Sequence, residues 1–490
     1  DVGGGFGTKT FVYREYPLVL EAAKRLGRPV KWTGDRTEHF MTDAQGRDNV
    51  VSAEMAMDDK GRFLGLRVNI VANLGAYIHQ YGPFIPWIGA TMSTGVYDIE
   101  ALDLGITGVY TNTCPVDAYR GAGRPEAALL LEKELVRQNG GSLPIVYTPL
   151  HGTGAVPVRE LLQRVGLTNV TMVPEQAAPD GTFPTVTAPN PEDPDAFRLA
   201  IALAEKTRAR VCLATDPDAD RLGVAVKTAK DEWITLTGNQ IGCILLEHVL
   251  STLDAQDKLP DNGVVIKSIV STRLADAICR AYGVELENVL TGFRFIGEKV
   301  DEYQTGGEKK FLFGFEESFG YLIGGLARDK DAICAAMFVA EACIVYAKRG
   351  MTLSDALDEI YAKYGHYAER VKAYTLEGKE GMEKISACMH ALRADRRTAF
   401  AGTPAALCED YLSGERTFAG GGTEKITLPE SNVLKWVLTD DSWIVVRPSG
   451  TEPKLKVYIG ARAENQAAVE SVLTALLADV DTLLKRHLFA

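Results

Sequence analysis

The sequence predicts a multidomain α/β protein with α+β segments at its two ends, and three observations carry this prediction. The chain has 490 residues, which is too long for one hydrophobic core and indicates three or four domains. From residue 142 onward, short apolar β-branched runs alternate with helical patterns, as they do in α/β domains. Residues 371–490 instead contain two β-rich runs around one polar loop, which indicates a smaller α+β domain.

Composition is typical of a soluble globular protein. Hydrophobic residues make up 46% of the chain and charged residues 24%, and the net charge is -12. This charge argues against nucleic acid or an anionic membrane as a partner. The longest apolar run, residues 332–347, contains Glu341 and is too short to span a bilayer, so we expect a buried helix there.

The eight cysteines and the first residues of the chain indicate the cellular compartment. The cysteines form no CxxC pair, so we expect reduced thiols and a cytoplasmic location. Residues 1–9 are glycine-rich and lack the apolar stretch of a secretory signal. The chain also lacks an initiator Met, so we expect a truncated start.

The stretch TDPDADR, residues 215–221, is the strongest chemical motif of the chain. It follows the apolar run 209–214, which reads as a short buried strand. Pro217 restricts its neighbourhood to extended or turn geometry, so the carboxylates of Asp216, Asp218 and Asp220 are expected to share one face. A hard divalent ion with oxygen ligands would remove their mutual repulsion, and Mg²⁺ suits such a site. A solvated acidic turn or a Ca²⁺ loop would show the same spacing, and Arg221 adds a fixed positive charge that we regard as a catalytic candidate.

Residues 1–138 begin with GGGFGTK and continue with a helical pattern over residues 16–26. Together with NLGAY and the loop YRGAGRPEA, these motifs resemble the molybdenum-binding subunit of the xanthine dehydrogenase and carbon monoxide dehydrogenase family. The resemblance implies that Phe6, Gly7 and Arg120 would lie beside molybdopterin. Gly121 stands where the carbon monoxide enzymes place a Cys. The second cofactor-binding region of that family has no counterpart downstream, so we expect neither bound molybdopterin nor a working molybdenum site.

Two further positions lie near the acidic motif. His151 sits on the tight turn after the strand PIVYT, where it is expected either to bond the turn backbone or to contact a substrate. Thr237 or Asn239 is expected to cap the helix that begins with QIGC.

Residues 258–370 contain two candidate substrate loops. In FLFGFEESFGYLIG, Glu316 and Ser318 supply an acceptor and a donor two residues apart, which suits sugar hydroxyls, although a solvated turn would look the same. In RDKDA, Arg328 and Lys330 would neutralise a phosphate, or would belong to a charged helix cap balanced by the adjacent aspartates.

The loop RPSGTEPK in the last domain is expected to bind phosphate. Arg447, Ser449, Thr451 and the Gly450 amide offer several donors within five residues, and glycine allows a close backbone approach. The alternative is a β-hairpin turn with incidental polar residues.

From residue 141 onward, the motifs TPLHGTG, TDPDADR, LTGF, GFEES, RDKDA and RPSGTEPK resemble the α-D-phosphohexomutase family, most closely bacterial phosphoglucomutases and phosphomannomutases. The resemblance implies Mg²⁺ at the three aspartates, sugar hydroxyls at Glu316 and Ser318, and the untransferred phosphate at residues 447–451. Arg294 stands where relatives commonly show Lys. The implied ligands are glucose 1-phosphate, glucose 6-phosphate and mannose phosphates.

The resemblance implies two phosphohexomutase-type α/β domains and a smaller C-terminal α+β domain, preceded by an α+β fragment similar to the molybdopterin subunit. The expected boundaries are 1–138, 142–257, 258–370 and 371–490. The implied reaction moves phosphate between O1 and O6 of a hexose through a bisphosphate intermediate and an enzyme phosphoserine.

The family carries that serine in a TASHNP-like loop of its first domain. The tripeptide SHN does not occur in this sequence. We therefore expect a fusion, natural or produced by gene assembly, with negligible mutase turnover. Three function classes follow: a phosphohexomutase by descent, a molybdenum hydroxylase, and a non-catalytic sugar-phosphate binder.

Overall fold

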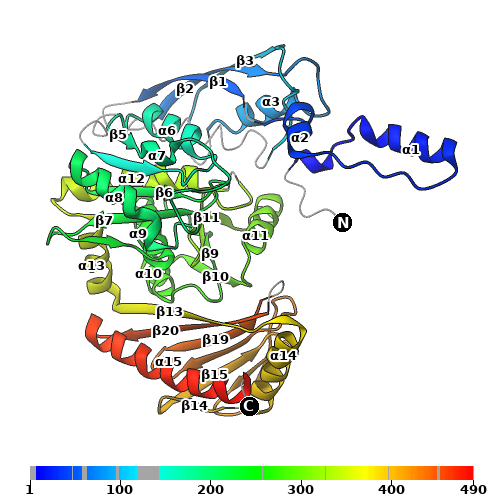
Figure 1. The fold of residues 1–490 in the computed structure, drawn as a ribbon. Helices are drawn as coiled ribbons and strands as arrows, with labels where there is room; N and C mark the ends of the chain where they lie inside the picture. The colour runs from blue at the N-terminus through cyan, green and yellow to red at the C-terminus, as the bar shows by residue number, and fades with distance from the viewer. Residues whose placement is uncertain are drawn as a thin grey trace. The chain divides into compact units, whose positions relative to one another are not determined.

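The structure is a computed structural model that describes residues 7–46, 48–57, 63–94, 99–119, 143–255, 258–325, 327–395, 397–449 and 453–488. The backbone contacts group the chain into two compact units. One unit consists of residues 1–143, 156–170 and 322–329, and the remaining residues form the other. Figure 1 shows the elements of both. None of the helices described by the structure has both the length and the apolar character needed to cross a membrane.

The front of the chain forms a three-stranded sheet with short helices. Its elements are η1 (Thr8–Thr10), α1 (Glu15–Leu26), α2 (Arg36–Thr42), β1 (Asn49–Met57), β2 (Phe63–Asn73), α3 (Phe84–Thr91) and β3 (Leu102–Val109). Strand β2 lies in the centre, antiparallel to β1 and parallel to β3. Alternate residues of β2 from Leu66 to Ala72 are buried and pack with Ala90 of α3. This period-two burial indicates a sheet covered on one face.

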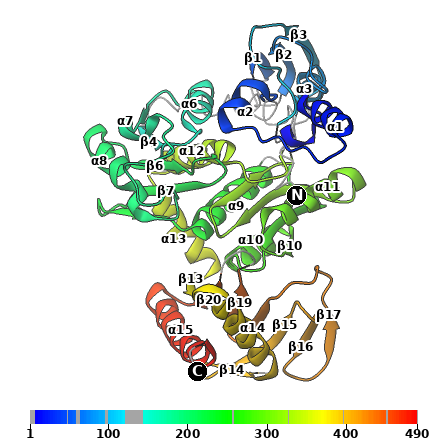
Figure 2. The same ribbon diagram turned by 45° about the vertical axis from the view of Figure 1, so that its right-hand side comes forward.

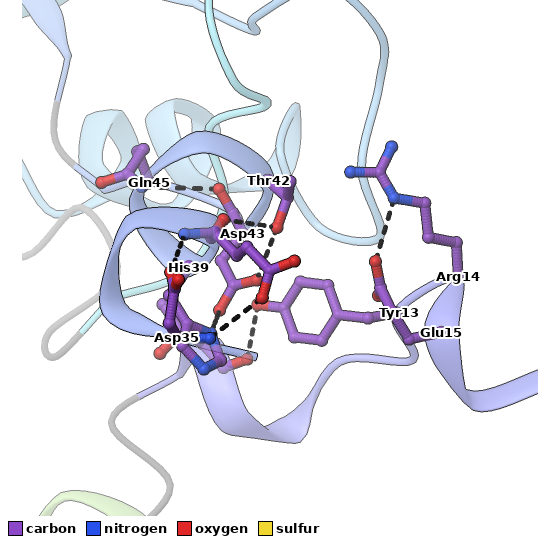
Figure 3. A network of polar contacts seen from close by, with 10 residues as sticks. Tyr13, Arg14, Glu15, Asp35, His39, Thr42, Asp43 and Gln45 are labelled. Atoms are coloured by element: carbon purple, nitrogen blue, oxygen red, sulfur yellow. Dashed lines mark hydrogen bonds and ion pairs between the residues drawn. The ribbon is translucent and has the colours of Figure 1, made fainter. Parts of the chain in front are cut away.

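The helices at the start of this unit differ in how they are held. Helix α1 occupies the expected residues and ends at Gly27 with a left-handed φ of 64°, but none of its residues is buried. Helix α2 is capped by Asp35, whose carboxylate accepts from the Glu38 amide, and Glu38 reciprocates. In Figure 3 the same polar network continues to His39, whose Nδ1 lies 2.7 Å from Asp43 Oδ2. Local polar contacts therefore hold helix α2, whereas α1 buries none of its residues.

The next sheet contains five strands in the order β5-β4-β6-β7-β8. Its elements and the connecting helices are β4 (Ile145–Thr148), α6 (Ala155–Arg164), β5 (Val170–Met172), α7 (Pro174–Ala177), η3 (Pro194–Phe197), α8 (Arg198–Thr207), β6 (Val211–Thr215), β7 (Leu222–Lys227) and β8 (Trp233–Thr235). Strands β4 and β6 are parallel, whereas β6, β7 and β8 run antiparallel. Strand β6 is buried along its whole length, as its apolar sequence predicts.

The third sheet has the strand order β10-β9-β11-β12, and β9 is parallel to both β10 and β11. Its elements are α9 (Gly238–Ala255), β9 (Gly263–Ser268), α10 (Leu274–Tyr282), β10 (Glu285–Val289), α11 (Phe293–Gly306), β11 (Lys310–Glu316), β12 (Gly320–Ile323), α12 (Ala332–Lys348) and α13 (Leu353–Tyr364). Helix α12 is the buried apolar helix expected from the sequence, and Asp331 caps it. Helix α9 contacts α10, α12, α13 and β11, and it also contacts β7 of the preceding sheet.

The C-terminal sheet is antiparallel throughout, with the order β13-β20-β19-β18-β15-β16-β17 and β14 paired to β15. Its elements are β13 (His366–Thr375), α14 (Gly378–Asp395), β14 (Ala399–Phe400), β15 (Thr403–Asp410), β16 (Glu415–Phe418), β17 (Thr423–Lys425), β18 (Leu434–Leu438), β19 (Trp443–Pro448), β20 (Lys454–Ala463) and α15 (Gln466–Leu488). Helices α14 and α15 contact each other and pack on the sheet, as Figure 2 shows.

A second apolar cluster joins the C-terminal sheet to the third one. Ile269, Val270 and Leu290, from loops at the ends of β9 and β10, pack against Trp443, Val445 and other residues of the C-terminal sheet. The loops of the third sheet and strand β19 are thereby held together by buried apolar surface. This packing positions the residues described next.

Candidate functional site

The acidic motif lies where the sequence places it, in the tight turn between β6 and β7. Ligand oxygens of Asp216, Asp218 and Asp220 lie within 4.8 Å of one another. Asp216 and Asp220 are each 8% exposed, whereas Asp218 is exposed to solvent. Two buried carboxylates and one open carboxylate thus converge on one point.

The convergence comes from a turn rather than from an extended segment. Asp216 Oδ1 accepts hydrogen bonds from the amides of Asp220 and Arg221, both at 3.0 Å. Ala219 takes a left-handed φ of 58°, and its amide donates to the Asp216 carbonyl. The first aspartate therefore folds the loop around its own side chain, which is what brings the third aspartate back to it.

The loop holds more negative charge than its surroundings readily accommodate. Burial, together with the charges of Asp220 and Asp218, raises the pKa of Asp216 to about 7, against the hydrogen bond from the Arg221 amide. A hard cation with oxygen ligands fits this donor set, because it would compensate the buried charge and leave positions for water or phosphate.

The loop after β4 packs directly against the metal loop. The amide and the hydroxyl of Thr153 both donate to the Pro217 carbonyl, at 2.8 and 3.0 Å. At Gly152, a β-carbon would meet that carbonyl oxygen at 2.6 Å and would overlap the Pro217 Cα. His151 is buried and shares a 2.8 Å hydrogen bond with the Thr185 hydroxyl. Gly152 of TPLHGTG is therefore needed for the close approach of this loop to the Pro217 backbone.

The Glu316–Ser318 turn between β11 and β12 joins the metal loop through the backbone. The Leu222 amide donates to the Phe319 carbonyl, and Arg221 forms a β-bridge with Gly320. Glu316 is 6% exposed, and its Oε1 accepts from the Gly292 amide at 2.6 Å. Burial raises the pKa of Glu316 to about 7, with a further contribution from the neighbouring Glu317.

Lys330 connects the RDKDA segment to the metal loop. Its Nζ lies 3.0 Å from Asp220 Oδ2. Its stem crosses Gly320, where a β-carbon would meet the Lys330 Cγ at 2.7 Å. Lys330 thus supplies a positive charge at the acidic cluster, and its expected phosphate role stays a prediction. Arg328 donates to the carbonyls of Gly325 and Ala327 in its own loop.

The C-terminal loop meets the same region through Arg447. At the end of β19, the Arg447 guanidinium hydrogen-bonds to the Thr291 hydroxyl, and Thr291 immediately precedes Gly292. The Ser449 amide donates to the Lys454 carbonyl at 2.7 Å. Gly450 and Thr451 lie outside the described residues. A continuous set of contacts therefore runs from the acidic cluster through Glu316 to Arg447.

Some sequence-predicted residues have other surroundings. Arg294 is exposed on the first turn of α11 and stacks on the Phe295 ring at 4.6 Å. Thr237 caps α9, since its hydroxyl accepts from the Gln240 amide. Asn239 instead bonds Glu369 Oε2 and the Thr272 amide.

Two residues of the region were not expected from the sequence. Glu317 accepts from the Ser268 hydroxyl at 3.0 Å, and Glu192 accepts from Arg221 at 3.1 Å. Both pairs join residues distant in the chain. Only the second glutamate of GFEES could have been noticed locally.

At the front, the predicted cofactor residues are only partly described. Phe6 and Arg120 lie outside the described residues. Gly7, with a φ of 92°, lies against the Ala118 carbonyl so closely that a side chain would overlap it. The absence of a side chain at Gly7 thus serves a contact within the chain.

Comparisons with known proteins agree with this arrangement. Residues 128–230 match phosphoglucomutase/phosphomannomutase α/β/α domain II, residues 237–364 match domain III, and residues 424–477 match the C-terminal domain of that family. This part of the chain belongs to the phosphoglucomutase/phosphomannomutase family. Residues 1–137 match a molybdopterin cofactor-binding domain.

Two curated relatives and two solved structures illustrate the match. Phosphoglucomutases of Staphylococcus saprophyticus and Staphylococcus aureus are each 38% identical, over 322 and 337 residues, or 66% and 68% of this chain. The chain spans 58% and 60% of their lengths. The fold resembles the phosphoglucomutase parafusin of Paramecium (TM-score 0.53, 16% identity, 78% of this chain and 65% of that one). It also resembles a family member from Burkholderia thailandensis (TM-score 0.50, 18% identity, 79% and 67%).

Proposed function

We propose that residues 143–490 bind hexose phosphates at a Mg²⁺ centre and descend from an enzyme that moves phosphate between O1 and O6 of glucose or mannose. The observation that carries the proposal is the set of contacts linking the acidic cluster, Glu316 and Arg447. A metal loop, a sugar loop and a phosphate loop joined in this way suit one ligand with hydroxyls in the middle and phosphate at an end. The family match of the same residues supports this reading, and we propose a cytoplasmic location with it.

Asp216, Asp218 and Asp220 would hold Mg²⁺, which when bound screens phosphate oxygens as a Lewis acid. Around it, the residues of the chain position the sugar. Glu316 has a pKa near 7, so at neutral pH it accepts from a sugar hydroxyl or donates to one. Ser318 offers a hydroxyl from the same turn.

The cationic residues bind phosphate. Lys330 faces the end at which phosphate is transferred, since it already lies beside Asp220. Arg447, with Ser449, Gly450 and Thr451, grips the other phosphate. Arg294 and Arg328 are proposed to add charge around the ligand, and Arg221 to stabilise the transferring group. Two phosphate sites on opposite sides of one sugar site would let the sugar bind in either orientation.

The reaction also needs a residue that carries the phosphoryl group. None of the seven histidines in this chain follows a serine, so the 490 residues contain no SHN-type loop. We therefore expect this chain alone to bind hexose phosphate without converting it.

The test combines binding with turnover. Calorimetric titration with glucose 1-phosphate should show binding that strengthens with Mg²⁺ and weakens in Asp218→Asn. Incubation with glucose 1-phosphate, the 1,6-bisphosphate and Mg²⁺ should give no glucose 6-phosphate above a blank. Absence of binding would refute the proposed ligand, whereas clear turnover would refute the expected lack of catalysis.

A second candidate rests on the molybdopterin-domain match of residues 1–137. A molybdenum hydroxylase role predicts molybdopterin in the purified protein. Extraction and fluorescence detection of oxidised pterin would show it, and we expect none. A pterin signal in stoichiometric amount would favour this second function.

A further inference from the structure

Glu192 contacts the metal loop from a segment that the proposed function does not use. Its Oε1 accepts a hydrogen bond from Arg221 Nη1 at 3.1 Å. On its other side, Arg221 Nε lies 3.8 Å from Asp216 Oδ2 and 3.8 Å from Asp220 Oδ1, beyond hydrogen-bond distance. The guanidinium is therefore bonded to Glu192 and only close to the two buried carboxylates.

The packing of the loop fixes the place of Glu192. The Asn190 side chain accepts from the Glu192 amide at 3.0 Å, and Pro191 is buried. At Gly223, two residues after Arg221, a β-carbon would meet Pro191 Cβ at 2.7 Å and the Pro191 carbonyl oxygen at 2.9 Å. The loop backbone thus lies directly on β7. The contact between Pro191 and Gly223 does not depend on the ion pair. The backbone packing therefore places Glu192 beside Arg221 independently of their charges.

We propose that Glu192 is a positioning residue of the metal centre, which holds the Arg221 guanidinium away from Asp216 and Asp220 and keeps these carboxylates available to a divalent cation. The inference rests on the proposed function in one respect, that the cation binds at the acidic loop. A guanidinium pairs readily with carboxylates through several donors. Without the charge of Glu192, Arg221 would turn toward Asp216 and Asp220 and compete with the cation for their oxygens.

The electrostatic balance supports this direction. Lys330 already lies 3.0 Å from Asp220, so a fixed positive charge from the described part of the chain is already in contact with the acidic cluster. A second one in contact would bring two fixed positive charges onto the carboxylates and reduce their attraction for a divalent ion. Glu192 keeps Arg221 in the outer position.

The experiment is a double-mutant cycle on the full chain, read by calorimetric titration with Mg²⁺ alone. Glu192→Gln keeps the size of the side chain and an acceptor but removes its charge. We expect it to raise the Kd for Mg²⁺ by about threefold to tenfold, the range of a moderate charge interaction. In the Arg221→Met background, the same substitution should change the Kd by less than about twofold, because the guanidinium that it positions is gone.

Two further variants separate positioning from a general charge effect. Glu192→Asp retains the charge on a shorter stem and should recover part of the affinity. Asp195→Asn removes an exposed charge from the same segment, whose carboxylate lies 3.8 Å from Arg198 Nε, and should leave the affinity unchanged. Far-UV circular dichroism and urea unfolding of each variant check that the fold is retained.

The outcomes distinguish the inference from the function on which it rests. If the unaltered chain does not bind Mg²⁺, both the metal assignment and the role of Glu192 are wrong. If it binds Mg²⁺ and Glu192→Gln binds equally well, or if the loss is the same with and without Arg221, the role of Glu192 is wrong and the metal site stands. If Glu192→Gln lowers the Mg²⁺ affinity only when Arg221 is present, the positioning role of Glu192 is established.

Discussion

Substituting Glu316 by Gln should stabilise the protein at alkaline pH and much less in acid. Burial raises the pKa of Glu316 to about 7 from its ordinary value of 4.5. The native state therefore binds the proton more tightly than the unfolded chain does. The resulting contribution to stability is complete below pH 4.5, declines as pH rises from there, and is lost once the pH passes 7.

The size of the effect follows from the two pKa values. Their difference is about 2.5 units, which corresponds to a cost of about 3 kcal/mol when the carboxylate is fully ionised in the fold. At pH 5 only about 0.8 kcal/mol of this cost is present, so the change between pH 5 and pH 8 is about 2.5 kcal/mol. Gln keeps an oxygen for the Gly292 amide but carries no charge. The variant should therefore gain about 2.5 kcal/mol over the unaltered chain between these two pH values.

Equilibrium urea unfolding at pH 5 and pH 8 measures this difference directly. Any pH-independent effect of the amide cancels when the two conditions are compared. Glu464→Gln, at an exposed position, serves as the matched control for the removal of one negative charge. If the free energy of unfolding of Glu316→Gln differs from that of the unaltered chain by the same amount at both pH values, the carboxylate is not the buried, proton-binding group described above. Weaker binding of glucose 1-phosphate by the same variant would show that this cost is retained for function.

Three further outcomes are expected. Asp218→Asn should weaken Mg²⁺ binding in calorimetric titration without lowering the urea midpoint, because Asp218 is exposed and its charge adds to that of a crowded cluster. Gly152→Ala should lower the free energy of unfolding by about 1 to 3 kcal/mol, since its β-carbon would overlap the Pro217 backbone. Asp481→Asn should destabilise the fold at pH 7 and by less at pH 2. Hydrogen bonds from Lys372, Lys485 and Tyr374 lower the pKa of Asp481, so its contribution is present above the unfolded value of 3.8 and is lost as pH falls.

The glycine prediction has a matched control variant, and each of the three predictions has a result that would contradict it. Gly181→Ala introduces the same methyl group where nothing lies within 4 Å, and it should not destabilise the chain. An equal loss in both glycine variants would show that overlap with the Pro217 backbone is not the cause. A destabilisation of Asp481→Asn that is as large at pH 2 as at pH 7 would show that the carboxylate acts through its shape. An unchanged Mg²⁺ affinity in Asp218→Asn would remove this residue from the metal site.

The sequence predicted the elements that local pattern controls. The buried strand before TDPDADR and the apolar helix α12 both lie where periodicity and turn residues indicated. The convergence of the three aspartates was also expected, but for a different reason. Extended alternation was assumed, whereas the structure uses hydrogen bonds from two amides to Asp216. Spacing identified the cluster because both geometries bring the same carboxylates together.

Contacts between distant segments could not be predicted in this way. Arg447 meets Thr291, and Asn239 reaches Glu369, because sheets far apart in the chain pack on one another. Helix α9 shows the same limit at the level of domains. Its sequence follows β8 directly, and it was grouped with that sheet, yet it contacts α10, α12, α13 and β11 as well as β7. Amphipathic pattern indicates that a helix buries a face, but not against which neighbour.

The acidic loop and Glu316 share one physical feature that ties the fold to its proposed function. Burial raises the pKa of both Asp216 and Glu316 to about 7, so each carboxylate costs stability when it is ionised at neutral pH. The hydrogen bonds that both side chains accept from backbone amides need an oxygen but not a negative charge. Lys330 offsets part of the charge but lies beside Asp220, where a ligand phosphate would compete for it. Buried charges that a fold tolerates rather than requires are typical of a site that a cation and a ligand complete.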